Sequence, residues 1–433
     1  MLRPTWRLRD LRVVLVGIVF VLAWVGVGYR LFQVQVVEAA TFVEDGEDQR
    51  IRVEEIAAKR GTIFDRDGIE LAVTIDQSTV VADPLLIVDP MGTAQLLAPL
   101  VNGDVTDLAD RLGQEGSRFT YVARHADSDT ADRIKAVVEE HEITGIFFQN
   151  EAYRMYPADD LAAQVLGFVQ QDSQMGLEGL EAQYDDLLTG TPGTKILERD
   201  RDGVPIPLGE LMTEPAIAGY DIRTTLNRGI QYVAQQAAAK AVADTGAHSA
   251  TLVVLDPKNG EILAMATAPT YNPNDRATID AAAVRNRAVT DVYEPGSTLK
   301  VVTIAAAMDQ GLVTPQSSWW VPAAYEVEGK EDPYTDVNRT EGRKMSVAEI
   351  ITRSSNVGTI QLQELLGNEL HYQYLEAFGL GKKSGDSIPG EVPGLLHPVT
   401  DWVSATAGAS TSIGYRVDVT ALQMAALFGT IAN

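Results

Sequence analysis

Residues Tyr293-Glu294-Pro295-Gly296-Ser297-Thr298-Leu299-Lys300 form the most informative stretch of the chain. Ser297 and Lys300 are three positions apart, and the apolar run 301–307 that follows is typical of a buried helix. Because positions i and i+3 share one helix face, the serine hydroxyl and the lysine amine should lie side by side at the helix N-terminus. A lysine that loses its proton can activate such a serine. The stretch therefore predicts covalent catalysis that needs neither histidine nor metal.

The same stretch predicts how Lys300 becomes a base. Pro295-Gly296 breaks the chain and exposes Ser297 at the first turn, while Lys300 lies at the mouth of an apolar core. A lysine starts near a pKa of ~10.4 and has to fall by several units to accept a proton at neutral pH. We expect burial and a neighbouring positive charge to cause this decrease.

Ser354-Ser355-Asn356 is the second candidate group. Ser346 and Glu349 form a capping box that opens the helix leading to it. Ser and Asn also favour helix ends for purely structural reasons, and Ser-x-x-Lys occurs on ordinary helices, so neither motif is specific alone. Together they are informative, because Ser354 can relay a proton between Lys300 and a leaving amine. Asn356 can orient both a substrate amide and Lys300.

Composition excludes several classes of function. The 433-residue chain has no cysteine, which removes disulfides, thiol catalysis and thiolate metal sites. Its net charge of −25 argues against nucleic-acid binding. The five histidines form no HExxH-like pair. We therefore expect neither a metal site nor a cofactor.

The N-terminus predicts a single membrane anchor. Residues 13–29 carry no charge, and Leu31 and Phe32 extend this apolar stretch to roughly the thickness of a bilayer core. Four arginines precede it, which places the tail 1–12 in the cytoplasm and everything after Arg30 outside. A cleaved signal peptide is the alternative, but no small-x-small cleavage site follows the apolar stretch. We expect a retained, single-pass anchor in the cell (inner) membrane.

The order of the predicted elements indicates an α+β fold. Residues 60–71 are predicted to form a strand, a tight Asp67-Gly68 turn and a second strand. A helix over 228–243, two apolar strands over 250–255 and 261–266, and helices over 297–310, 357–366, 371–378 and 420–431 follow. Strand 250–255 is apolar on both sides, which predicts a sheet covered on both faces. We divide the chain into a cytoplasmic tail 1–12, an anchor 13–32, an elongated pedestal 33–215 and a second domain 220–433.

The chain resembles the class B penicillin-binding proteins, which are peptidoglycan D,D-transpeptidases. The resemblance covers nearly the whole length. It is carried by Arg60-Gly61-x-Ile63-x-Asp65-Arg66-x-Gly68, Arg154-Met155-Tyr156-Pro157, Gly176-Leu177-Glu178-Gly179-Leu180-Glu181 and the two serine motifs in order. Residues 286–297 are similar to the division-specific branch, with the elongation branch as its nearest rival. The resemblance implies a dimerisation-like pedestal and a serine β-lactamase-like transpeptidase domain.

The resemblance also implies a mechanism. Ser297 forms an acyl-enzyme on a D-Ala-D-Ala stem peptide and passes it to the amine of a neighbouring stem peptide. Lys300 is the base, Ser354 and Asn356 complete the catalytic set, and the Ser297 backbone N–H is one oxyanion donor. β-Lactams acylate the same serine. The implied partners are the membrane, a glycosyltransferase and other division proteins.

Three other functions stay open at this point. A penicillin-sensing receptor also uses Ser-x-x-Lys, but such receptors carry several spans. A non-catalytic wall-synthesis scaffold fits the lack of a third family motif, Lys-Thr-Gly, after Asn356. A β-lactamase is disfavoured because an anchor and a pedestal serve no purpose for a soluble hydrolase. Lys382-Lys383-Ser384-Gly385 is the nearest match to the third motif, and we reject it because no strand pattern surrounds it.

The missing third motif leads to a prediction about the chain itself. We expect the transpeptidase domain to be C-terminally truncated and to lack its last strands, which would leave an apolar edge and face exposed. The 433-residue chain expressed alone should then fold poorly after about residue 220 and fail to trap labelled penicillin. In-gel fluorescence of a labelled penicillin measures this, and clean stoichiometric labelling of Ser297 would contradict it.

Overall fold

The computed structural model describes residues 8–38, 51–199, 205–337, 341–385 and 388–433. The chain divides into two compact units, one made of Met1–Ala58 with Thr191–Ala218 and the other of Lys59–Gly190 with Gly219–Asn433. Most of residues 33–215 belong to the second unit. The α+β class is confirmed.

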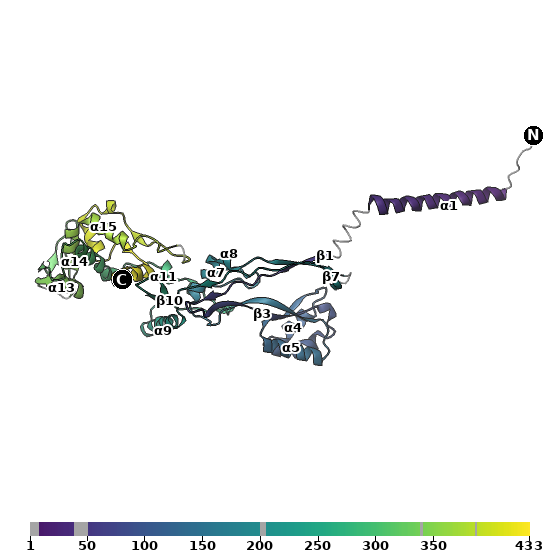
Figure 1. Cartoon of the computed structure of the whole chain (residues 1–433). Coiled ribbons are helices and arrows are strands. Elements are labelled where there is room, and N and C mark those ends of the chain that lie inside the picture. Colours follow the sequence, from purple (N-terminus) through teal and green to yellow (C-terminus); the bar gives the residue numbers. More distant parts are fainter. Residues whose placement is uncertain (1–7, 39–50, 200–204, 338–340, 386–387) are drawn as a thin grey trace, which may run out of the picture. The chain divides into compact units, whose positions relative to one another are not determined.

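The first unit contains the predicted anchor. Helix α1 spans Leu8–Phe32 and continues as a π-helical turn over Gln33–Val37 (Figure 1). Within the described ranges this is the one helix long and apolar enough to cross a membrane, with a mean hydropathy of 2.1. The unit also holds an antiparallel sheet in which β6 (Gly193–Arg199) lies between β1 (Ile51–Ile56) and β7 (Pro205–Glu214). The strand-and-loop segment expected after residue 191 is therefore mostly strand.

The second unit begins with a sheet built around one long strand. Strand β3 (Glu70–Ala82) pairs antiparallel with β2 (Ile63–Phe64), β4 (Thr120–Ala126) and β5 (Ile146–Met155), and β2 pairs in parallel with β8 (Ile222–Arg223). The predicted turn between β2 and β3 is confirmed. Asp65 holds it, because its Oδ1 accepts hydrogen bonds from the backbone N–H groups of Asp67 and Ile69.

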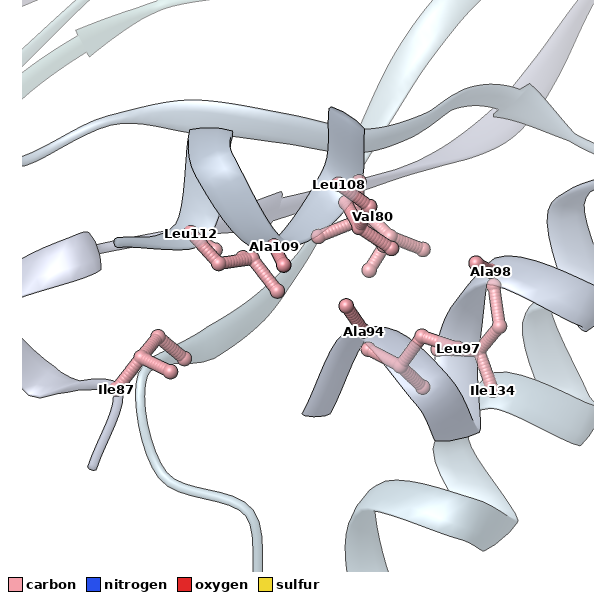
Figure 2. Packing of buried hydrophobic residues seen from close by; sticks show 11 residues of the cluster. Val80, Ile87, Ala94, Leu97, Ala98, Leu108, Ala109, Leu112 and Ile134 are labelled. Carbon is pink, nitrogen blue, oxygen red and sulfur yellow. The ribbon is translucent and has the colours of Figure 1, made fainter. Parts of the chain in front are cut away.

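Helices cover one end of this sheet. Helices α3 (Pro90–Leu97), α4 (Val105–Leu112) and α5 (Ser128–Glu140) begin with an aspartate whose side chain accepts a backbone N–H, which satisfies one open donor of each helix. Their apolar sides meet Val80 of β3 in a buried cluster that includes Leu97, Leu108 and Ile134 (Figure 2). This end of the sheet thus has a core of its own.

The three pedestal motifs meet at a single buried carboxylate. Glu181, with a side chain 0% exposed, accepts a hydrogen bond from Arg60 Nε at 2.6 Å and another from Arg154 Nε at 2.7 Å. Arg60 also donates to Asp185, and Arg154 donates to the Gly61 carbonyl. Two motifs supply arginines and the third supplies the carboxylate that they share, so α7 (Gly179–Gln183), β5 and the chain before β2 are held together.

Of the two strands predicted to be covered on both faces, β10 (Ile262–Ala268) is mostly buried, whereas every residue of β9 (Ala250–Leu255) is only partly buried. Strand β9 pairs antiparallel with β10. Ala264 and Ala266 pack against Ala234 of α9 (Arg228–Thr245), while Met265 packs with Val289 and Leu422 on the opposite face. Asn227 caps α9 and Gly246 ends it in a left-handed conformation, both as expected.

Helices make up most of the remaining chain. The long ones are α12 (Lys300–Asp309), α13 (Val347–Thr352), α14 (Asn356–Leu366), α15 (Asn368–Ala377), α16 (Ala405–Ser412) and α17 (Ala421–Ala432). The short elements are α6 (Ala163–Leu166), α7 (Gly179–Gln183), α8 (Asp185–Leu188), α10 (Ala281–Val284), α11 (Arg287–Thr290), β11 (Ser318–Val321), β12 (Ala324–Tyr325), β13 (Tyr334–Thr335), β14 (Arg343–Ser346), β15 (Leu395–Leu396) and β16 (Val417–Asp418). The predicted helices 357–366 and 420–431 are confirmed within one residue, and helix 371–378 begins earlier, at Asn368. Helix α16 was not predicted, because its Ala, Ser, Thr and Gly residues show no apolar periodicity.

The buried carboxylate generates a stability prediction. Glu181→Gln keeps the size of the side chain but leaves Arg154 without its countercharge and Arg60 with Asp185 alone, and both arginine side chains are 1% exposed. Removing one partner from a buried ion pair costs about 3–5 kcal/mol. Urea unfolding of the detergent-solubilised protein should show a loss of that order. Asp107→Asn, in the exposed pair with Arg111, is the control and should change the free energy of unfolding by less than about 0.5 kcal/mol. Equal losses in the two variants would contradict the prediction.

Candidate active site

Ser297 lies in a tight turn that leads into helix α12. Gly296–Leu299 form a 3-10 turn, and the α-helix begins at Lys300 rather than at Ser297 as predicted. Gly296 has a φ of 57°, which glycine adopts without strain and which places Ser297 on the exposed side of the turn. Leu299 on the opposite side is fully buried. The turn thus presents the hydroxyl to solvent and anchors itself in the core.

A distant segment braces this turn. The Gly296 N–H donates to the Gly414 carbonyl at 3.0 Å, and Tyr293 exchanges both backbone hydrogen bonds with Val419. Gly414 has a φ of 86°, and a Cβ there would lie 1.9 Å from the Gly296 carbonyl oxygen. Glycine is therefore required at 414, and the segment after α16 fixes the position of the serine turn.

Lys300 is enclosed by the second serine motif. The residue is 2% exposed. Its Nζ donates to the Ser354 carbonyl at 2.6 Å, to Ser354 Oγ at 3.1 Å and to Asn356 Oδ1 at 2.7 Å. An ammonium group has three N–H donors, so these three oxygens use all of them. The structure brings together three of the four residues predicted for the site.

Ser354 reaches Lys300 with two oxygens because its backbone is left-handed. Its φ is 53°, a region that non-glycine residues rarely adopt and that costs of order 1–3 kcal/mol. The turn joins α13 to α14, and in this conformation both the carbonyl and the hydroxyl of Ser354 point at the amine. Such strained residues gather at functional sites when the surroundings hold them in place.

The surroundings of Ser354 are supplied by strand β13 and the residue after it. Ser355 Oγ donates to Asp336 Oδ2 at 2.7 Å, and the Val357 N–H donates to Asp336 Oδ1 at 3.0 Å. Asn356 Nδ2 donates to the Thr335 carbonyl at 3.0 Å, which leaves its Oδ1 facing Lys300. The turn is thus held from one side by Thr335 and Asp336 and from the other by Lys300.

Burial lowers the pKa of Lys300 from 10.5 to about 8, and the Asp336 carboxylate opposes this decrease. The pKa of Lys300 is lowered, as predicted, but one of the two predicted causes is wrong. Burial acts as expected, whereas the nearby charge is negative and not positive. The sequence could not reveal this, because Asp336 is 36 positions from Lys300 and reaches the site only through the fold.

A second layer of uncharged groups lies behind Lys300. Thr303, one turn further along α12, has its Oγ1 3.0 Å from Nε2 of the fully buried His371 and donates to the Ser412 carbonyl at 3.3 Å. Burial lowers the pKa of His371 to about 3, so this imidazole carries no charge at neutral pH. The layer links α12, α15 and α16 without adding a charge near the amine.

Of the four residues predicted for the site, Ser297 takes no part in the hydrogen bonds that join Lys300, Ser354 and Asn356. In the part of the chain that the structure describes, its hydroxyl bonds neither to Lys300 nor to another side chain, although Lys300 is only one turn away. In free enzymes such bonds are often long and form only with substrate bound. Chemically, the group offers an exposed hydroxyl next to an amine of lowered pKa, with a second hydroxyl and an amide beside it.

Sequence reasoning missed several residues that build this site, namely Thr335, Asp336, Gly414 and Val419. Asp336 follows a two-residue strand too short to be predicted, and Gly414 follows the unpredicted helix α16. The rejected Lys382–Gly385 stretch lies outside every strand, in agreement with the sequence interpretation.

Comparison with known families places both halves of the chain. Residues 250–433 match the penicillin binding protein transpeptidase domain, and residues 55–224 match the penicillin-binding protein dimerisation domain. The chain is 33% identical to the peptidoglycan D,D-transpeptidase FtsI of Escherichia coli K12, over 93% of this chain and 68% of that protein. It is 32% identical to the penicillin-binding protein PbpB of Mycobacterium tuberculosis, over 93% of this chain and 61% of that protein.

Solved structures agree with these sequence matches. Penicillin binding protein 2X from Streptococcus thermophilus superposes with a TM-score of 0.69 at 27% identity, covering 88% of this chain and 59% of that one. Penicillin binding protein 3 of Mycobacterium tuberculosis in complex with aztreonam gives 0.64 at 28% identity, covering 88% and 65%. With both domains in order, a relative that is 33% identical over 68% of its length and the serine motifs in one site, the chain belongs to the class B penicillin-binding proteins.

Proposed function

We propose that this protein is a serine D,D-transpeptidase that cross-links peptidoglycan stem peptides. The observation that carries the proposal is the buried Lys300 amine, which donates to Ser354 and Asn356 and whose pKa is lowered to about 8 by burial. An amine of this kind can accept a proton close to neutral pH. The named transpeptidases among the relatives support the same reaction.

In the acylation step Ser297 attacks the carbonyl of the penultimate D-Ala. The Ser297 proton passes to Lys300, an ester forms on Ser297 Oγ, and the terminal D-Ala leaves as an amine that takes up a proton. Ser354 Oγ, 3.1 Å from Lys300 Nζ, is placed to carry that proton to the leaving group. The Ser297 backbone N–H is one donor for the oxyanion.

In the second step the amine of a neighbouring stem peptide attacks the ester. The amine loses a proton to the Lys300–Ser354 pair, a new peptide bond forms, and Ser297 Oγ regains its proton. Asn356 has a fixed amide orientation because its Nδ2 is bound by the Thr335 carbonyl, so it can orient the substrate peptide beside Lys300. β-Lactams acylate Ser297 in the same way, since their strained amide takes the place of the scissile peptide bond.

The apolar helix and the family support a proposal for the location and partners. The described residues include one helix suited to cross a membrane, and we propose that it spans the inner membrane with residues 1–12 in the cytoplasm and the catalytic part outside. Residues 33–215 would form the pedestal and residues 220–433 the transpeptidase domain. The match to FtsI and the 286–297 stretch favour septal wall synthesis, with a glycosyltransferase and other division proteins as partners.

Replacing the nucleophile tests the proposal directly. In the full-length product of the encoding gene, Ser297→Ala should abolish covalent labelling by a fluorescent penicillin, because no ester can form without the hydroxyl. Ser173→Ala, at an exposed loop serine, is the matched control and should label like the wild type. In-gel fluorescence with intact-mass analysis measures both. Labelling that persists in Ser297→Ala overturns the assignment, and a wild type that never labels favours the scaffold function.

The lowered pKa of Lys300 sets a pH dependence. Lys300 acts only when neutral, and its neutral fraction rises as the pH increases through about 8, so the second-order acylation rate should rise with a midpoint near that pH. Lys300→Arg keeps the positive charge permanently and should slow acylation by about 10²–10⁴-fold. Lys240→Arg, at an exposed lysine of α9, should leave the profile unchanged. A rate independent of pH around neutrality would contradict the role of Lys300.

A further inference from the structure

Asp336 touches the motif that encloses Lys300, yet the reaction described above does not use it. We infer that Asp336 is a positioning residue of the acylation step, whose carboxylate holds the Ser354–Asn356 turn against Lys300 and whose negative charge opposes the loss of the Lys300 proton. The inference rests on the proposed function and adds a residue that regulates the pH range of the site.

Both carboxylate oxygens of Asp336 are used, Oδ2 by the Ser355 hydroxyl at 2.7 Å and Oδ1 by the Val357 N–H at 3.0 Å. Ser355 is 1% exposed, and its Oγ also accepts the Gly358 N–H at 3.0 Å as the cap of α14. Asp336 therefore places a negative charge at the N-terminus of an 11-residue helix, where the helix dipole stabilises it.

Ser355 lies between the two residues that bind the Lys300 amine. Ser354 and Asn356, on either side of it, provide all three oxygens that bind the Lys300 amine. Ser355 is buried and is bound to Asp336 and Gly358, so fixing its hydroxyl restricts the backbone of both neighbours. Because Ser354 has a φ of 53°, the turn has a less strained alternative, and the Asp336 contacts are what stabilise the observed one.

Asp336 acts on Lys300 across the turn and raises its pKa, against the effect of burial. The charged groups on the helices that pack against α12 bind elsewhere: Glu349 of α13 pairs with Arg343, and Glu364 of α14 accepts a hydrogen bond from Tyr325. Arg353 is exposed, and His371 of α15 is uncharged at neutral pH. Beside burial, Asp336 is the group that shifts the pKa of Lys300.

A pH profile separates positioning by charge from simple structural support. In the full-length gene product we would measure the acylation rate by a chromogenic β-lactam from acidic to basic pH. Asp336→Asn should move the rise in rate to lower pH, by about half a pH unit or more, because no negative charge then stabilises the protonated form of Lys300. Its maximal rate should fall several-fold, since the turn is held less firmly. Asp336→Glu, which restores the charge, should bring the rise back to the wild-type pH.

Ser355→Ala is the matched control, because it loosens the same turn while keeping the Asp336 charge. It should lower the maximal rate and leave the pH of the rise unchanged. An Asp336→Asn profile that is lower throughout but rises at the wild-type pH would overturn the inference, since it would show structural support alone. If Asp336→Asn does not fold, as judged by thermal unfolding, the smaller and equally uncharged Asp336→Ser provides the same test. Failure of the proposed function is seen separately, as labelling of Ser297→Ala.

Discussion

The site depends on the burial of the Lys300 amine, away from water. Lys300 is almost fully buried, and burial disfavours its charge, while three oxygens of Ser354 and Asn356 and the charge of Asp336 favour it. The balance leaves the pKa of Lys300 near 8, where the amine exists in both forms at physiological pH. A more exposed lysine would stay charged, and one without these acceptors would be costly to bury. Each feature of the fold around α12 serves to maintain this balance.

The fold maintains the balance between burial and charge at Lys300 by bracing short segments of the site with segments that are distant in sequence. The serine turn is braced by Gly414 and Val419, and the Ser354–Asn356 turn is braced by Thr335 and Asp336. The pedestal uses the same principle with charges, because Glu181 binds Arg60 and Arg154 from two other motifs. Asp65 links the pedestal motif to the catalytic part, because its Oδ2 accepts a hydrogen bond from the N–H of Arg228 at the start of α9. Long-range contacts of this kind keep the reactive groups at fixed distances.

Local signals in the sequence predicted the local parts of this structure. The anchor, the capped helix α9, the Asp67-Gly68 turn and the capping box at Ser346 were predicted because each depends on residues close in sequence. The motifs also predicted that Lys300, Ser354 and Asn356 belong to one site. The sequence did not predict the 3-10 turn at Ser297, helix α16, or the part played by Asp336, because these depend on packing between distant segments. The same reason explains why the charge near Lys300 was expected to be positive and is negative.

The central claim is that Lys300 is a desolvated base, and a direct titration of its side chain tests this most simply. The full-length protein would be labelled with 13C at the lysine Cε positions, with the Lys300 signal assigned from its loss in Lys300→Arg, and followed by NMR as the pH rises. The account predicts a midpoint near 8 for Lys300. A midpoint at the ordinary value of 10.5 would contradict it, because the amine would then be charged throughout the physiological range and unable to activate Ser297.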